Sequence, residues 1–214
     1  MMEIVFVTDY VCPYCLVAKE ALRQALEETG IEAVIHTEPM ELTVEPKPRP
    51  DTWNDPVRRS HYTILTEPCR QLGLDMKIPP HVIPRPYTRL AFEGWFFAQE
   101  HGRGEEWHDL MYRAYFMEEL DIGELPVLKM LAERLGLDSA ALEEALVSGR
   151  YTAQEKAAVA YSREAYQPDG VPTVFIDGQR VEINEYTKDE MIRLLTGVHT
   201  GNGAGMACGP DGCA

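Results

Sequence analysis

The sequence predicts an α/β fold whose single sheet is divided, along the chain, by a long all-helical insertion. Three observations support this: an apolar run typical of a buried strand near the N-terminus, helical periodicity from about residue 55 to residue 167, and strand patterns after it. A chain of 214 residues can bury a substantial hydrophobic core. Its 45% hydrophobic and 26% charged residues are typical of a globular protein and exclude a wholly disordered chain.

The N-terminal segment predicts a strand, a helix and a second strand. Residues 4–7 are continuously apolar, as in a strand buried on both faces of a sheet. A helix should follow, because apolar residues recur at helical spacing from Ala18 to Leu26, and Gly30 stands where a C-terminal cap belongs. With a second strand at residues 33–37 this is a βαβ unit, whose two strands should be parallel.

A linker and a series of helices are predicted next. Three prolines within residues 43–50 indicate the linker. Helical patterns that end at glycine or at a break in periodicity then predict further helices. Their expected ranges are residues 88–101, 105–116, 124–135, 139–147 and 152–166.

Strand character returns after the helices. Residues 174–176, the turn pair Asp177-Gly178 and the alternation in residues 179–183 predict a β-hairpin. Thr187 and Glu190 form a capping-box pattern that opens a last helix, to about residue 196.

The order of these elements predicts three parts of the chain. Residues 1–42 and 168–196 should form one discontinuous α/β domain, and residues 43–167 a helical insertion domain. Residues 197–214 are Gly-rich and should form a flexible tail.

The charge balance limits the partners. The chain has 20 basic and 35 acidic residues, a net charge of −15, so phosphate backbones are repelled and a nucleic-acid partner is not expected. No apolar run approaches the roughly 20 residues of a membrane-spanning helix, so no membrane partner is expected. The first residues lack the basic and apolar regions of a signal peptide, and we therefore expect a cytoplasmic protein.

The segment Cys12-Pro13-Tyr14-Cys15 lies at the junction between the first strand and its helix. Two thiols two residues apart on a first helical turn can form a disulfide with little movement, and the helix dipole stabilises the thiolate of the first. Pro13 suits the first helical position because its missing N–H would have no partner there. Cys12 is therefore the predicted nucleophile and Cys15 the resolving cysteine. The alternative, half of a zinc site, lacks a second ligand pair in the fifty residues that follow.

Val171-Pro172-Thr173 leads into the predicted strand at residues 174–176. A proline before a central strand cannot donate to the ladder of hydrogen bonds, so its presence needs a reason. A cis Val171–Pro172 bond would provide one, by placing the Val171 backbone beside the dithiol, where it could pair with an extended substrate. The alternative is an ordinary trans proline that begins a strand.

Taken together, these features resemble the DsbA family of the thioredoxin fold. The order of strand, Cys12-Pro13-Tyr14-Cys15 on a helix, strand, helical insertion, Gly170-Val171-Pro172-Thr173, hairpin and helix carries the resemblance, over about residues 3–195. The chain is also similar to the FrnE-like branch. The segments that carry this similarity are Asp9-Tyr10-Val11-Cys12-Pro13, Glu38-Pro39-Met40-Glu41-Leu42, Ala114-Tyr115-Phe116-Met117-Glu118, Asp121-Ile122-Gly123 and Gly136-Leu137-Asp138.

This chain departs from the branch in one place. Where the branch usually shows Asn-Thr followed by Ala-His, the sequence has Tyr87-Thr88 and Ala91-Phe92. Any contribution of that histidine to substrate binding is therefore absent here.

The resemblance implies a cofactor-free thiol–disulfide oxidoreductase or isomerase that acts on protein disulfides. Cys12 and Cys15 would be catalytic, and substrate would meet residues on either side of them. Its partners would be disulfide- or thiol-bearing proteins and a cellular reductant or oxidant, and no metal site is proposed. The implied substrate-contacting residues are Pro13, Tyr14, Val171 and Pro172.

Two other functions remain open. The Pro-Tyr pair between the cysteines also occurs in many glutaredoxins, so a glutathione-dependent thiol transferase is one alternative. The other is a holdase-like binding module, in which the insertion grips exposed hydrophobic segments and the dithiol has a secondary role.

Three cysteines lie outside this motif. Cys208 and Cys213 flank a Gly-Pro-Asp-Gly turn sequence that should bring their thiols close. We predict that they form a second dithiol that exchanges electrons with Cys12 and Cys15, since a comparable pair occurs in some FrnE-like proteins; a passive disulfide or a partial metal site is the alternative. Cys69, in an apolar helical stretch, is expected to be a small buried hydrophobe.

Overall fold

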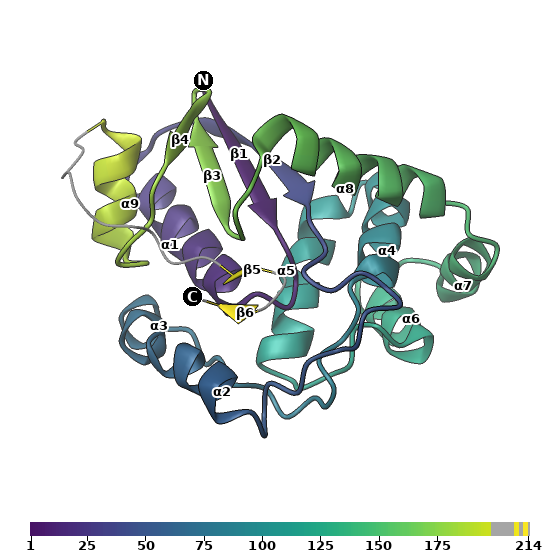
Figure 1. Cartoon of the computed structure of the whole chain (residues 1–214). Coiled ribbons are helices and arrows are strands. Elements are labelled where there is room, and N and C mark those ends of the chain that lie inside the picture. Colours follow the sequence, from purple (N-terminus) through teal and green to yellow (C-terminus); the bar gives the residue numbers. More distant parts are fainter. Residues whose placement is uncertain (198–207, 210–211, 214) are drawn as a thin grey trace.

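Strands from the two ends of the chain meet in one sheet in the computed structural model, which describes residues 1–197, 208–209 and 212–213 (Figure 1). The strands are β1 (Met2–Thr8), β2 (Ala33–Pro39), β3 (Thr173–Ile176), β4 (Gln179–Val181), β5 (Cys208–Gly209) and β6 (Gly212–Cys213). The helices are α1 (Pro13–Thr29), α2 (Pro56–Thr63), α3 (Thr66–Leu72), α4 (Arg89–Glu100), α5 (Gly104–Phe116), α6 (Leu125–Arg134), α7 (Ser139–Val147), α8 (Thr152–Tyr166) and α9 (Lys188–Leu195).

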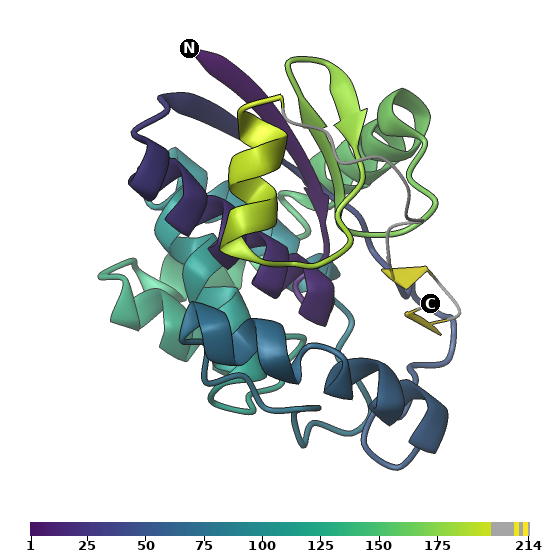
Figure 2. The same cartoon turned by 90° about the vertical axis from the view of Figure 1, so that its left-hand side faces the viewer.

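The main sheet has the strand order β2-β1-β3-β4. β1 is parallel to β2 and antiparallel to β3, so the predicted βαβ unit and the predicted joining of two chain segments in one sheet are both confirmed. Helices α1 and α9 pack against each other on one face, and α8 packs against β2 on the other (Figures 1 and 2). The register pairs Val7 with Thr173, which brings the carboxyl end of β1 beside the start of β3.

The helical segment between β2 and β3 packs around α4, which contacts α5, α6, α7 and α8. A glycine allows α4 and α5 to pack closely at one point. A Cβ atom at Gly94 would lie 2.3 Å from Cζ2 of Trp107, and the Trp107 indole donates a 2.9 Å hydrogen bond to the Ala91 carbonyl. The predicted mixed α/β fold with a helical insertion is confirmed, and the limits proposed for its domains stay a prediction.

Several predicted boundaries need correction. The chain between α3 and α4 is not helical, because its four prolines (Pro79, Pro80, Pro84 and Pro86) lack the N–H groups that a helix requires. The strand expected at residues 179–183 ends at Val181. The predicted flexible tail falls mostly outside the described residues. Within the residues that the structure describes, no helix is long and apolar enough to cross a membrane.

Candidate active site

Cys12 lies at the N-terminal end of α1, a few residues after the end of β1. Its backbone is extended (φ −90°, ψ 115°), and Pro13 is the first helical residue, as predicted. The Cys12 amide donates to the Asp9 carbonyl (3.0 Å), and the Cys15 amide donates to the Cys12 carbonyl (3.2 Å). These bonds fix both cysteines on one helical turn, with the unpaired amides and positive dipole end of α1 beside Cys12. Both are free thiols and both are fully buried.

Val171 is distant from Cys12 in the sequence but contacts it in the structure. The Val171–Pro172 peptide bond is cis, which is the first of the two alternatives that the sequence allowed. The Cys12 thiol donates to the Val171 carbonyl at 3.3 Å. This contact follows from the sheet register, because Val7 and Thr173 are paired and the chain leaves both strands at the same edge.

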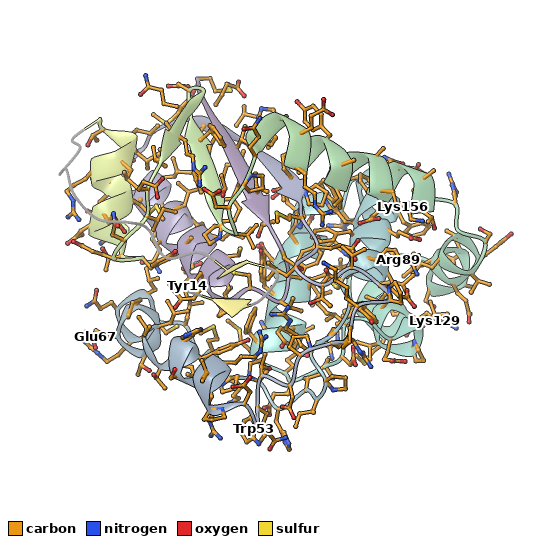
Figure 3. The ribbon with its side chains drawn as sticks, in the orientation of Figure 1. Tyr14, Trp53, Glu67, Arg89, Lys129 and Lys156 are labelled. Atoms are coloured by element: carbon orange, nitrogen blue, oxygen red, sulfur yellow. The ribbon has the colours of Figure 1, made fainter. Side chains whose placement is uncertain are left out.

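Two tyrosines border the dithiol. The Tyr14 hydroxyl donates to the His61 carbonyl in α2 (3.2 Å), and the Tyr14 ring lies 5.1 Å from the ring of Tyr186. Figure 3 marks Tyr14 near the start of α1. Burial and the nearby charge of Cys12 raise the pKa of Tyr14 to about 12. Burial, with Cys12 and Cys15 nearby, also raises the pKa of Tyr186. Sequence reasoning missed Tyr186, because a tyrosine just before a helix carries no signal of contact with a distant helix.

The Cys15 thiol is buried, and its pKa is shifted by its neighbours. Burial first, and then the neighbouring Cys12, raise the pKa of the Cys15 thiol well above its ordinary range. A hydrogen bond from the Thr8 side chain and another from the Asp9 backbone act in the opposite direction. The resolving thiol is therefore mostly protonated near neutral pH, and the groups that donate to it matter for its reactivity.

Asp9 anchors the loop that carries the dithiol. Its Oδ2 accepts a 2.7 Å hydrogen bond from the Leu42 amide, which ties the end of β1 to the segment after β2. Burial raises the pKa of Asp9, against the Leu42 hydrogen bond and the nearby Arg85 charge, which lower it.

A second group of buried carboxyls lies toward the helical segment. Glu41 and Glu155 are both buried, and each influences the pKa of the other. Burial and the charge of Glu155 raise the pKa of Glu41 to about 8. Burial and the charge of Glu93 raise the pKa of Glu155 to about 7. Glu41 also lines a cavity of about 360 Å³.

Arg89 and Lys156 border this cavity, and Figure 3 shows both on the helical side of the molecule, away from Tyr14. The carboxyl pair is therefore a feature separate from the dithiol.

The structure brings together the six residues predicted for the main site, which are Cys12, Pro13, Tyr14, Cys15, Val171 and Pro172. Cys69 is buried in α3, and burial raises its pKa to about 11, as suits a packed thiol. For Cys208 and Cys213 the backbone alone is described, and it pairs the two residues in the antiparallel strands β5 and β6. Among the described residues, no three His, Cys, Asp or Glu side chains are arranged to hold a metal ion.

The sequence of this chain is similar to a known family and to a known protein. The family model described as "DSBA-like thioredoxin domain" matches residues 3–190. The uncharacterized protein YwbO of Bacillus subtilis is 36% identical over 190 residues, which cover 88% of this chain and 93% of that protein.

Solved structures show the same fold at lower identity. A probable DsbA oxidoreductase of Streptomyces coelicolor superposes with a TM-score of 0.73 at 22% identity, covering 100% of this chain and 99% of that one. The cytosolic disulfide reductase DsbM of Pseudomonas aeruginosa superposes with a TM-score of 0.66 at 17% identity, covering 91% and 97%.

Proposed function

Because the chain belongs to the DSBA-like thioredoxin domain family, we propose that it is a thiol–disulfide oxidoreductase or isomerase acting on protein disulfides. Cys12 is the nucleophile and Cys15 the resolving cysteine. The observation that carries this proposal is the position of Cys12 at the N-terminal end of α1, with its thiol 3.3 Å from the Val171 carbonyl. The finer assignment to the FrnE-like branch remains a prediction.

The reaction has two steps. The Cys12 thiolate attacks one sulfur of a substrate disulfide, which gives a mixed disulfide and a substrate thiolate. Cys15 then attacks the Cys12 sulfur, which releases the second substrate thiol and leaves a Cys12–Cys15 disulfide. The substrate is reduced and the dithiol oxidised, and the reverse sequence transfers a disulfide to the substrate.

Residues around Cys12 would orient the substrate. The Val171 carbonyl already accepts a hydrogen bond from the Cys12 thiol, so it is positioned to pair with the backbone of an extended chain beside its disulfide. Pro13 and Tyr14 on one side and Pro172 on the other would border that chain.

We assign the protein to the cytoplasm, where a cellular thiol system would reduce its disulfide. The similarity to a cytosolic disulfide reductase supports this assignment.

The reduction potential of the Cys12–Cys15 pair tests the proposal. We expect a reversible two-electron couple when the protein is equilibrated in glutathione buffers and its thiols are trapped and counted. A midpoint near roughly −270 mV would indicate a reductase, and one of roughly −120 to −180 mV an oxidase or isomerase. The couple should vanish in Cys12→Ser and in Cys15→Ser. Absence of any reversible couple in the parent protein would contradict the proposed function.

We further propose that Cys208 and Cys213 form an auxiliary dithiol. They are paired residues of adjacent antiparallel strands, whose Cα separation of about 4.5–5.5 Å suits a disulfide. Strand β6 packs against α2, the helix whose His61 carbonyl accepts the Tyr14 hydrogen bond (Figure 2). The two described tail strands therefore lie near the first turn of α1.

Replacing both tail cysteines by serine is expected to slow turnover in at least one of a series of glutathione redox buffers. The reversible Cys12–Cys15 couple should remain. The measurement is turnover of a model protein disulfide across a series of glutathione ratios, with Cys69→Ser as the matched control. Unchanged turnover at every ratio would show that the tail pair is a passive disulfide.

A further inference from the structure

Two buried hydroxyls lie behind the resolving cysteine. Thr8 is the last residue of β1 and Tyr112 lies in α5, and their hydroxyls hydrogen-bond each other. Each residue is only 1% exposed, so water does not compete for this bond. The Thr8 side chain also lies beside the Cys15 thiol and acts to lower the pKa of that thiol. A strand, the dithiol helix and a helix of the insertion thus contribute one group each to a continuous chain.

Tyr112 is held in place by other rings. The Tyr10 ring packs edge-on against it at 5.4 Å, and the Phe116 ring lies parallel to it at 6.5 Å. The Tyr10 hydroxyl has its own partner, Nδ1 of His108, at 2.6 Å. The phenol of Tyr112 is therefore fixed before any reaction, as an effective hydrogen-bond donor in a low-dielectric site must be.

We propose that Thr8 and Tyr112 are positioning residues for the second step of the reaction, because their two hydroxyls donate in series to the thiolate of Cys15. The role of Thr8 and Tyr112 in turnover rests on the proposed function. Their effect on the ionisation of Cys15 can be tested without a protein substrate.

The chemistry follows from the nature of hydroxyl groups, which both donate and accept. While Cys15 is a thiol, its S–H can donate to Thr8, whose hydroxyl then donates to Tyr112. Once Cys15 has lost its proton to solvent, the chain reverses: Tyr112 donates to Thr8 and Thr8 donates to the sulfur. The negative charge thus gains a charge-assisted hydrogen bond.

The stabilised thiolate then completes the exchange. Cys15 attacks the Cys12 sulfur, the bond from Cys12 to the substrate breaks, and the Cys12–Cys15 bond forms. The electron pair leaves on the substrate sulfur, which takes a proton from water. In the reverse direction Cys15 is the leaving group, and the same donors stabilise it.

The Asp9 backbone also lowers the pKa of Cys15, and Thr8 is the side chain that does so. In the second step Cys12 is joined to the substrate through its sulfur and has no proton to donate. The nearby His108 is neutral, since burial lowers its pKa well below its ordinary value, and its ring is bonded to Tyr10. Thr8 is the side-chain donor at the sulfur, and Tyr112 is its support.

The first test measures the ionisation of Cys15 alone. In a Cys12→Ser background, the Cys15 thiol is titrated by the ¹³Cβ chemical shift of labelled cysteine. Thr8→Val should raise its midpoint by about one pH unit or more, as loss of a hydrogen bond to a charged group implies, and Tyr112→Phe by about half of that. Tyr10→Phe removes an equally buried hydroxyl that is bonded elsewhere, and should leave the midpoint unchanged. An unmoved midpoint in Thr8→Val and Tyr112→Phe would overturn the inference.

The second test separates the two chemical steps. In a Cys208→Ser, Cys213→Ser background, the reduced protein reacts with an aromatic disulfide that releases one coloured thiol when Cys12 attacks and another when Cys15 resolves the adduct. Thr8→Val should leave the first phase unchanged and slow the second about threefold, since a tenfold loss of thiolate is half offset by its higher nucleophilicity. Equal slowing of both phases would indicate a general structural effect instead and would contradict the proposal. Failure on protein substrates with these effects intact would count against the proposed function only.

Discussion

Replacing Cys12 by serine is expected to abolish disulfide exchange, with a loss of turnover of about a thousandfold or more. The hydroxyl of serine is not ionised near neutral pH and cannot form the mixed disulfide, although it fits the same position at the start of α1. Cys15→Ser should fail differently. It keeps the nucleophile, so the protein should remain joined to its substrate through Cys12, and the adduct should be visible on a non-reducing gel.

The measurement is the rate at which the protein reduces a model protein disulfide in the presence of a thiol. Cys69→Ser serves as the control, because Cys69 is buried in α3 and should leave the rate unchanged. If Cys12→Ser retained the parent rate, the dithiol would not be the active site. If the variant lost turnover but still suppressed aggregation of an unfolded protein as well as the parent, the helical insertion would have the binding activity of a holdase.

Glu155→Gln is expected to stabilise the protein at pH 8 and to have little effect at pH 5. The pKa of Glu155 is raised to about 7 in the folded protein, and that of its partner Glu41 to about 8. An unfolded chain releases the same protons near pH 4.3. Between about pH 4.3 and pH 8 the folded state binds more protons than the unfolded state, so the free energy of unfolding falls as the pH rises. Glutamine stays neutral and removes this loss, by about 2 kcal/mol at pH 8.

Thermal unfolding at the two pH values measures this effect. A difference of about 2 kcal/mol should raise the melting temperature by roughly 4–8 °C at pH 8 in a protein of this size. Glu164→Gln is a matched control on the same helix, because Glu164 is exposed and its substitution should have the same small effect at both pH values. An equal change in both variants would show that Glu155 titrates as an ordinary surface carboxyl.

The sequence could predict the parts of this protein that depend on local patterns. The helix of residues 13–29 was recognisable because Pro13 begins it, an apolar stripe follows and Gly30 ends it in a left-handed conformation (φ 66°). The non-helical chain before α4 was missed, although its prolines carry the signal. Four of them within a short stretch outweigh the apolar residues that lie between them.

The dithiol could also be predicted from a local sequence motif, but the residues that surround it could not. The contact of Cys12 with Val171 depends on a register between strands more than 150 residues apart, which no local pattern encodes. Thr8 and Tyr112 gave no signal, because a strand-ending threonine and a helical tyrosine are common packing residues. Glu155 was missed for a related reason: a glutamate on a helix is normally exposed, and its burial here follows from tertiary packing.

The pairing of β1 with β3 also has a consequence for biosynthesis. A ribosome makes Cys12 and Cys15 before the helical insertion and the strand that follows Val171 after it, so the emerging chain carries two unshielded thiols while the insertion is translated. Until β3 docks, the Val171 carbonyl is absent from the Cys12 side, and the sheet lacks its central antiparallel pair. Long-range contacts of this kind form late in folding. Nascent chains truncated before residue 171 should therefore present cysteines that react as ordinary exposed thiols, and the site is complete only when both parts of the sheet have been made.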